Sequence, residues 1–340
     1  MTQSHGQSAP SPLGGWLRGL AGAGQPHRRL ARRRLALALQ GGGSFGAFTW
    51  GVLDALLGDP AVTLAAASGA SAGAVNAVVL AQGLLDGGPE GARQLLARLW
   101  DEVAHAARFS PPDGVAHHLS IDLFTQVLSP YQFNPWRFNP LRDLLMALVD
   151  FPRLRRERPL RLFLAATRVD TGAARVFREH EVSAEVVLAS ACLPTLHHAV
   201  EIDGIAYWDG GYSANPPILP LVVDGGCDEV LLVQLNPTRH DGLPTSAPGI
   251  HARIKRLMFN APLMHELDLL TAMREQAGRH WWPDPASRRL RRLSLHRLGI
   301  DGVDPSLRAT SALSARRAFL AVLKGEGERA ARTWLEPTRT

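Results

Sequence analysis

The chain has 340 residues, of which 46% are hydrophobic and 20% are charged, a composition typical of a globular protein and not of a disordered or membrane-embedded one. Residues 1–34 hold six arginines and no acidic residue, which leaves 31 of the 37 basic residues to balance 31 acidic ones. Since the body of the protein is neutral, we expect no nucleic-acid partner, because such proteins carry a basic face on the domain itself.

Residues 1–34 are rich in Gly, Ser, Pro and Gln and contain no apolar stretch of signal-peptide length. We therefore predict a disordered basic arm at 1–34 and one domain at 35–340. A solvated tail is the first interpretation of the arm, and a transient contact of its arginines with an anionic membrane surface is the alternative.

The two cysteines, Cys192 and Cys227, form no disulfide or metal-binding pattern, and we expect both thiols to be reduced. Reduced cysteines and the lack of an export signal favour a cytoplasmic location, with peripheral association at the membrane as the alternative. His197 and His198 are interpreted as structural or rim residues, because no further metal-type side chains lie near them in the sequence.

Residues 35–39, Leu-Ala-Leu-Ala-Leu, form an apolar run typical of a central parallel strand, and residues 47–57 are predicted to be helical. The loop between them is rich in glycine. Such a unit can bind a nucleotide, but no lysine closes the loop and no G-x-G-x-x-G pattern with a suitable acid follows. A better use of the glycines is to point bare backbone N–H groups at an oxyanion.

The next unit is centred on Ser71. Residues 62–67 are a short apolar strand, Gly69-Ala70-Ser71-Ala72-Gly73 matches G-x-S-x-G, and residues 72–85 are predicted to form a buried helix. Small residues allow a sharp turn that exposes the serine oxygen, and the helix N-terminus would favour negative charge there. A plain turn is one alternative, and a transmembrane helix over the uncharged residues 61–85 is another.

Residues 90–107 are predicted to be helical. The segment from 113 to 151 mixes prolines with aromatic residues, and we expect it either to cover a pocket for an acyl chain as a mobile element or to pack as an ordinary long connection.

Regular patterns return after residue 160. Strands are predicted at 160–166 and 174–177, a helix at 183–191 and a hairpin at 202–208 that leads to Asp209-Gly210-Gly211. On its own this motif would be a turn, but its two glycines allow a serine to approach the carboxylate closely. A central strand at 229–235, an amphipathic helix at 254–273, a strand at 291–298 and a helix at 312–334 complete the domain. Trp281-Trp282 is assigned to the core or an interface, with contact at a bilayer surface as the alternative.

The glycine-rich loop, the serine turn and the Asp-Gly-Gly motif occur in an order that resembles the patatin-like phospholipase family over residues 35–235. The resemblance implies an α/β fold with a mostly parallel central sheet between helices and a serine nucleophile elbow. It also implies a lipid acyl hydrolase (phospholipase A, lysophospholipase or esterase) that cleaves carboxylic esters of lipid or fatty-acyl substrates. Neither a cofactor nor a metal is implied, and the oligomeric state stays open.

By this resemblance Ser71 is the nucleophile and Asp209 takes its proton directly. Gly41, Gly42, Gly43 and Gly46 form the oxyanion and substrate-binding loop. Two positions depart from the family: Gln40 stands where an acid is common, and Phe45 stands where an arginine is frequent. Without this cation, the sequence supports the prediction of ester hydrolysis more strongly than the prediction of a phospholipid substrate.

Two other functions remain open. In an α/β-hydrolase triad, Ser71 and Asp209 would be joined by a later histidine; the candidates are His240, His251, His265 and His296. Alternatively, the chain is a lipid- or protein-binding module that keeps the fold without the chemistry.

Overall fold

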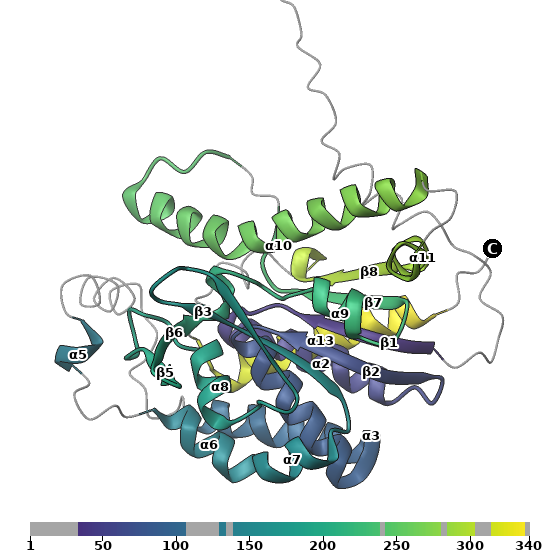
Figure 1. Ribbon diagram of the computed structural model, residues 1–340. Coiled ribbons are helices and arrows are strands. Elements are labelled where there is room, and N and C mark those ends of the chain that lie inside the picture. Colours follow the sequence, from purple (N-terminus) through teal and green to yellow (C-terminus); the bar gives the residue numbers. More distant parts are fainter. Residues whose placement is uncertain are drawn as a thin grey trace, which may run out of the picture.

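A mixed sheet of eight strands runs through the middle of the protein, in the order β5-β6-β3-β2-β1-β7-β8, with β4 paired to β3 (Figure 1). Five neighbouring strands are parallel: β3 (Arg161–Arg168), β2 (Val62–Gly69), β1 (Arg33–Leu39), β7 (Glu229–Gln234) and β8 (Ser294–Gly299). The antiparallel strands are β4 (Ala174–Arg178), β5 (Val200–Ile202) and β6 (Ile205–Asp209). The predicted fold class is confirmed.

The computed structural model describes residues 33–106, 129–133, 139–238, 242–279, 284–302 and 314–336. Arm residues 1–32, most of the aromatic segment, His240 and Trp281-Trp282 lie outside the described residues. Arg33 and Arg34, which we assigned to the arm, are the first residues of β1, and Arg33 forms an ion pair with Glu229 of β7.

The two faces of the central strand β1 enter different cores. Leu35, Leu37 and Leu39 pack against α2 (Gly46–Leu57), α3 (Ala72–Ala106) and α13 (Arg317–Leu335). Ala36 and Ala38 face the other side, where α9 (Leu219–Asp224), α10 (Ala247–Arg279) and α11 (Pro285–Arg292) lie (Figure 1). Burial on both faces explains why this strand has no polar alternation.

The predicted helices at 72–85 and 90–107 are confirmed as two parts of α3, joined at a kink where Gly87 and Gly88 leave helical geometry. Gly88 has φ of +62°, a conformation that suits glycine. The transmembrane alternative for residues 61–85 is wrong, because residues 62–69 form strand β2. Within the described residues, no helix combines the length and the apolar character that crossing a membrane requires.

The shorter predicted elements are also confirmed. Ser183 caps α8 (Ala184–Ser190), and α10 extends beyond the predicted helix 254–273 at both ends. Helix α13 begins at Arg317, later than the predicted start at 312, because residues 314–316 are not helical. Further helices are α5 (Pro130–Phe133), α6 (Pro140–Leu148) and α7 (Phe151–Glu157), and short 3-10 turns occur at η1 (Gly43–Phe45), η3 (Gly210–Tyr212) and η4 (Ile300–Gly302).

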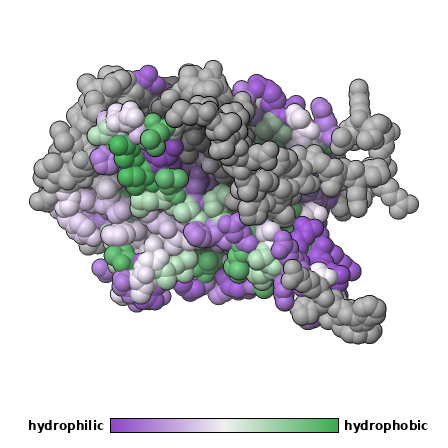
Figure 2. Space-filling model, turned by 90° about the horizontal axis from the view of Figure 1, so that it is seen from above, coloured by the Kyte–Doolittle hydropathy of each residue, from purple (hydrophilic) through white to green (hydrophobic). Residues whose placement is uncertain are grey.

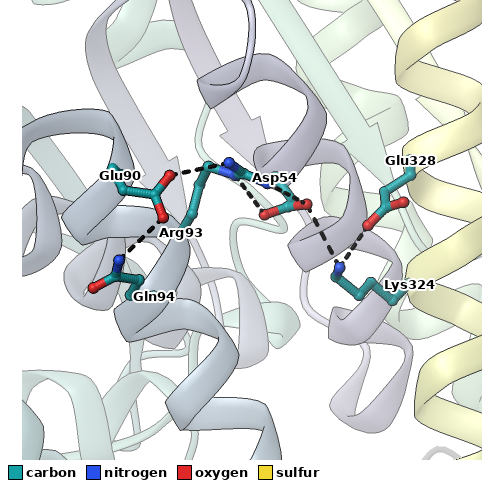
Figure 3. Close-up of polar contacts among 6 residues, drawn as sticks. All are labelled: Asp54, Glu90, Arg93, Gln94, Lys324 and Glu328. Carbon is teal, nitrogen blue, oxygen red and sulfur yellow. Dashed lines mark hydrogen bonds and ion pairs between the residues drawn. The ribbon is translucent and has the colours of Figure 1, made fainter.

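One acidic side chain ties together the three helices on the leucine side of the sheet (Figure 3). Asp54 of α2 accepts a hydrogen bond of 2.9 Å from Arg93 of α3, and Lys324 of α13 lies 3.5 Å from its other oxygen. Burial opposes ionisation of Asp54, but the Arg93 hydrogen bond and the two cations outweigh it and lower its pKa. The ion pairs therefore fix the relative positions of α2, α3 and α13.

Helices α2 and α13 approach so closely that their backbones touch. A methyl group at Gly327 would lie 2.0 Å from the carbonyl oxygen of Phe48, and one at Gly51 would lie 1.9 Å from that of Lys324. Gly325, two residues before Gly327 on α13, has open space around it. The first two glycines are therefore required for packing, whereas the third is not.

We predict opposite effects of the same substitution at two positions of α13. Gly327→Ala should lower the free energy of unfolding by about 2–4 kcal/mol, because the added methyl group overlaps the backbone of α2. Gly325→Ala should raise it by about 0.5–1 kcal/mol through helix propensity. Urea denaturation followed by circular dichroism measures both values, and a stabilised Gly327→Ala variant would contradict the close contact.

Candidate active site

Ser71 lies in a sharp turn between β2 and α3, at the carboxyl end of the parallel strands. Its φ of +54° is in the left-handed region, which is rare for residues other than glycine. Methyl groups at Gly69 and Gly73 would lie 2.5 Å from the Gly73 carbonyl carbon and 2.0 Å from the Leu39 carbonyl oxygen. The two motif glycines are thus required by close backbone packing that holds the serine in a strained conformation.

Asp209 lies at the end of β6 and is completely buried. Its Oδ1 accepts a 2.7 Å hydrogen bond from the Gly211 N–H, while its Oδ2 has no partner that meets hydrogen-bond geometry among the described residues. The Ser71 hydroxyl is near enough to act on this carboxyl as a donor and lower its pKa. Because Oδ2 is not saturated, it remains able to accept a proton.

The end of α8 holds both of these residues. The Ser71 N–H donates to the Ser190 carbonyl at 3.0 Å and to the Ser190 hydroxyl at 3.1 Å. The Asp209 N–H donates to the Cys192 carbonyl at 2.8 Å. Two residues that are 138 positions apart in the sequence are therefore positioned by one short segment, Ser190 to Cys192.

Desolvation raises the pKa of Asp209 to about 7, although the Gly211 N–H and the Ser71 hydroxyl act in the opposite direction. No cation is among the groups that act on this carboxyl. Its neighbours Cys192 and Tyr212 have their own pKa values raised to about 12, first by burial and then by the charge of Asp209. The site thus contains a weak acid that titrates near neutral pH, among neutral groups.

The Asp-Gly-Gly turn is packed on both sides. A methyl group at Gly210 would lie 2.2 Å from the Ala165 carbonyl oxygen, and one at Gly211 would lie 2.4 Å from the Phe259 ring. In addition, the Thr167 hydroxyl donates to the Asp209 carbonyl at 2.7 Å. These contacts hold the backbone of the turn that carries the carboxylate.

Some backbone N–H groups of the glycine-rich loop are hydrogen-bonded within the protein, and others are free. The Gly41 N–H donates to Asn215 Oδ1 at 2.7 Å, and the Gly46 N–H donates to the carbonyls of Gly43 and Ser44 in the short turn η1 that precedes α2. By contrast, the N–H groups of Gly42 and Gly43 make no hydrogen bond with described residues. Gly41 and Gly46 therefore support the loop, and the other two glycines have free donors.

A buried cluster of side-chain amides, Gln40, Asn215, Asn236 and Asn260, surrounds Gly41. Gln40 Oε1 accepts from the N–H groups of Leu235 and Asn236, and its Nε2 donates to Asn260 Oδ1 at 3.2 Å. Asn236 donates to the Gly41 carbonyl at 3.1 Å. Of these four residues, only Gln40 was singled out from the sequence, as a departure from the family, because no local spacing links the four.

The cluster explains the residue at position 40. A glutamine both accepts from the end of β7 and donates to α10, whereas a carboxylate can only accept. Phe45, the other departure, is buried and packs edge-on against Phe319 of α13 with 5.8 Å between the ring centroids. An apolar contact therefore occupies the position where a cation was expected.

None of the described histidines is among the groups that act on Asp209. His296 lies on β8, where its Nε2 is 3.0 Å from Glu229 and its ring contacts Trp334. His251 and His265 are exposed on α10. The His198 ring lies 4.0 Å from that of Tyr131 between centroids, tilted by 41°, and its Nε2 contacts the Pro130 carbonyl at 3.0 Å, which is compatible with the structural or rim role expected for it.

In the part of the chain that the structure describes, no three His, Cys, Asp or Glu side chains gather into a group that could hold a metal ion. One hollow of about 550 Å³ lies beside α2 and α13, and another of about 380 Å³ lies beside β4 and β5. Neither is lined by Ser71 or Asp209. The site is therefore defined by its side chains and backbone donors.

The chain was compared with known proteins. A family model described as patatin-like phospholipase matches residues 37–222. Among solved structures, the crystal structure of VipD from Legionella pneumophila is similar, with 16% sequence identity, a TM-score of 0.38 and coverage of 89% of this chain and 67% of the VipD chain. No curated protein matched the chain.

Burial of Asp209 predicts a characteristic dependence of stability on pH. Because its folded pKa of about 7 exceeds the ordinary 3.8, its contribution to stability is full below about pH 4 and is lost as the pH rises to about 7. Asp209→Asn keeps the acceptor for Gly211 and removes the buried charge. We expect this variant to melt at a higher temperature than the wild type at about pH 8, with the difference vanishing near pH 4.

Asp54→Asn serves as the control, since the pKa of Asp54 is lowered and the neutral substitution should destabilise the protein at neutral pH. Thermal melts across this pH range measure both variants. Equal melting temperatures of Asp209→Asn and wild type at every pH would show that Asp209 is not buried as a charge.

Proposed function

Because the chain belongs to the patatin-like phospholipase family, we propose that it is a lipid acyl hydrolase in which Ser71 and Asp209 form a catalytic dyad. The observation that carries this proposal is the buried carboxyl of Asp209, with an unsatisfied Oδ2 and a raised pKa, beside a serine in a strained turn. A general base that titrates near neutral pH is matched to proton transfer from a hydroxyl.

In the proposed acylation step, Ser71 Oγ attacks the carbonyl carbon of the ester and its proton moves to Asp209 Oδ2. The negative charge on the carbonyl oxygen is met by the free N–H groups of Gly42 and Gly43, each worth about a hundred- to a thousandfold in rate. When the tetrahedral intermediate collapses, the C–O bond to the alcohol breaks and protonated Asp209 returns the proton to the leaving oxygen.

In the second step, a water molecule replaces the alcohol. Asp209 takes one of its protons, the hydroxide attacks the acyl carbon, and the proton returns to Ser71 Oγ as the fatty acid leaves. The same carboxyl thus acts as base and then as acid in each half of the reaction, for which a pKa of about 7 is well suited.

The substrate we propose is a carboxylic ester of a lipid or fatty acid. Phe45 is buried against Phe319, so this position provides no cation for a head-group phosphate. We therefore propose ester hydrolysis ahead of selectivity for phospholipids. The division into an arm at 1–34 and a domain at 35–340, and the cytoplasmic location, remain proposals.

A non-catalytic binding module is the second candidate function. It is favoured by the engaged N–H of Ser71, which donates to Ser190 and is therefore not a free donor for substrate. Reaction with a fluorophosphonate probe distinguishes the two, because only an activated serine becomes labelled.

We predict that Ser71→Ala and Asp209→Asn each lower kcat on p-nitrophenyl esters by about a thousandfold or more, since both remove a participant in the bond-making step. His251→Ala, His265→Ala, His296→Ala and His240→Ala should each keep wild-type activity within about twofold. Initial rates across acyl lengths measure this series. One essential histidine would replace the dyad with a triad.

The dyad also predicts the pH profile. Since the base must be ionised, kcat/KM should rise with pH through about 7 and stay level above it. The same profile in His240→Ala, His251→Ala, His265→Ala and His296→Ala variants would show that none of these histidines is the source of the limb. A profile whose acid limb lies near pH 4, the ordinary range of an aspartate, would contradict the proposed role of burial.

A further inference from the structure

Helix α10 has apolar side chains on two opposite faces. Its inward face packs Leu263, Leu267 and Leu270 into the core on the alanine side of β1. Its N-terminal half also presents four large apolar residues to solvent: Ile250, Ile254, Leu257 and Met258, with exposed fractions between 41% and 55%. Their spacing of four, three and one residues places them together on the outward face.

A further apolar side chain extends this surface. Leu243, in the loop before the helix, is 87% exposed. Arg253 donates to the Gly242 carbonyl at 3.3 Å, which holds this loop against α10. Figure 2 looks down on this side of the molecule and shows a hydrophobic area bordered by hydrophilic side chains. We call Leu243, Ile250, Ile254, Leu257 and Met258 the α10 apolar surface.

The charged side chains in the N-terminal half of α10 are all basic. Arg253, Lys255 and Arg256 lie in this half of the helix, and no acidic residue occurs between 247 and 265. The first acid, Glu266, is turned inward, where it accepts from the N–H groups of Ile218 and Leu219. Aliphatic side chains flanked by cations are the pattern of a helix that lies in the interface of an anionic membrane.

We infer that the N-terminal half of α10 is a docking surface for anionic lipid bilayers. This surface would insert its aliphatic side chains between the head groups, while Arg253 and Arg256 meet lipid phosphates. The choice of a lipid partner rests on the proposed function, but the binding itself requires no catalysis.

The position of α10 relative to the candidate site supports this inference. The Phe259 ring is in contact range of Gly211, the Phe259 carbonyl accepts from Asn215 at 3.0 Å, and Asn260 accepts from Gln40. The helix therefore contacts the acid turn and Gln40, the residue that precedes the glycine-rich loop. A bilayer on its outward face would lie next to the site where a lipid ester has to enter.

The other exposed large apolar residues do not form such a surface. Tyr131 is on α5, Met146 on α6, Val223 on α9 and Val322 on α13, and Leu269 lies on the C-terminal half of α10, eleven residues after Met258. Single exposed apolar side chains are ordinary on soluble domains, whereas the α10 apolar surface is a contiguous group. Val322 thus offers a matched position at which the same substitution should have no effect on docking.

The test uses the full chain with Ser71→Ala, so that vesicles are not hydrolysed. We measure its flotation with vesicles of phosphatidylcholine alone and of equal amounts of phosphatidylcholine and phosphatidylglycerol. We expect binding to the anionic vesicles that weakens as salt is raised. Adding Ile254→Glu and Leu257→Glu should reduce this binding by about tenfold or more, and adding Val322→Glu should leave it unchanged.

A second measurement separates this inference from the proposed function. With Ser71 intact, the Ile254→Glu/Leu257→Glu variant should hydrolyse a soluble ester at the wild-type rate. This activity also shows that the variant is folded. If the wild type is inactive on esters but floats with anionic vesicles, docking stands and the catalytic proposal fails. Absence of binding by the Ser71→Ala chain, or equal binding by the docking variant, overturns the inference and leaves a protein partner for the surface.

Discussion

The buried carboxyl of Asp209 is the constraint on which the candidate site depends. Full burial without a cation is costly for the ionised form, and the protein offsets only part of that cost with the Gly211 N–H and the Ser71 hydroxyl. A salt bridge would have stabilised the carboxylate but would also have lowered its pKa and made it a weaker base. The same desolvation that opposes folding at neutral pH therefore gives Asp209 the basicity that the proposed mechanism requires.

Such a carboxyl is useful only if its neighbours cannot relax, and the surrounding backbone supplies this rigidity. Ser190 and Cys192 hold the serine turn and the acid turn through carbonyl groups, so the two turns share one support. On the other side, Asn215 bonds the Gly41 N–H and is itself bonded to Phe259 of α10. Strain at Ser71 can persist because contacts from several elements determine its position.

The sequence analysis succeeded where the signal was local. The apolar run at 35–39, the serine turn and the Asp-Gly-Gly motif each occupy a few adjacent residues, and their strand, turn and helix were located correctly. The amide cluster could not be found this way, because Gln40 and Asn260 are 220 positions apart and meet only after the sheet has formed. Similarly, the sequence showed that Phe45 replaces a cation. Its contact with Phe319 could not be predicted, because Phe319 belongs to a helix far along the chain.

The amide cluster also connects the two parts of the molecule that the proposals concern. Asn260 lies two residues after Met258 of the α10 apolar surface, and its side chain accepts from Gln40, which precedes the glycine-rich loop. A shift of α10 on binding a bilayer would therefore change a hydrogen bond next to Gly41 without any change in Ser71 or Asp209. Since the loop glycines carry the free N–H groups, lipid contact at the surface and oxyanion binding in the site would be physically linked.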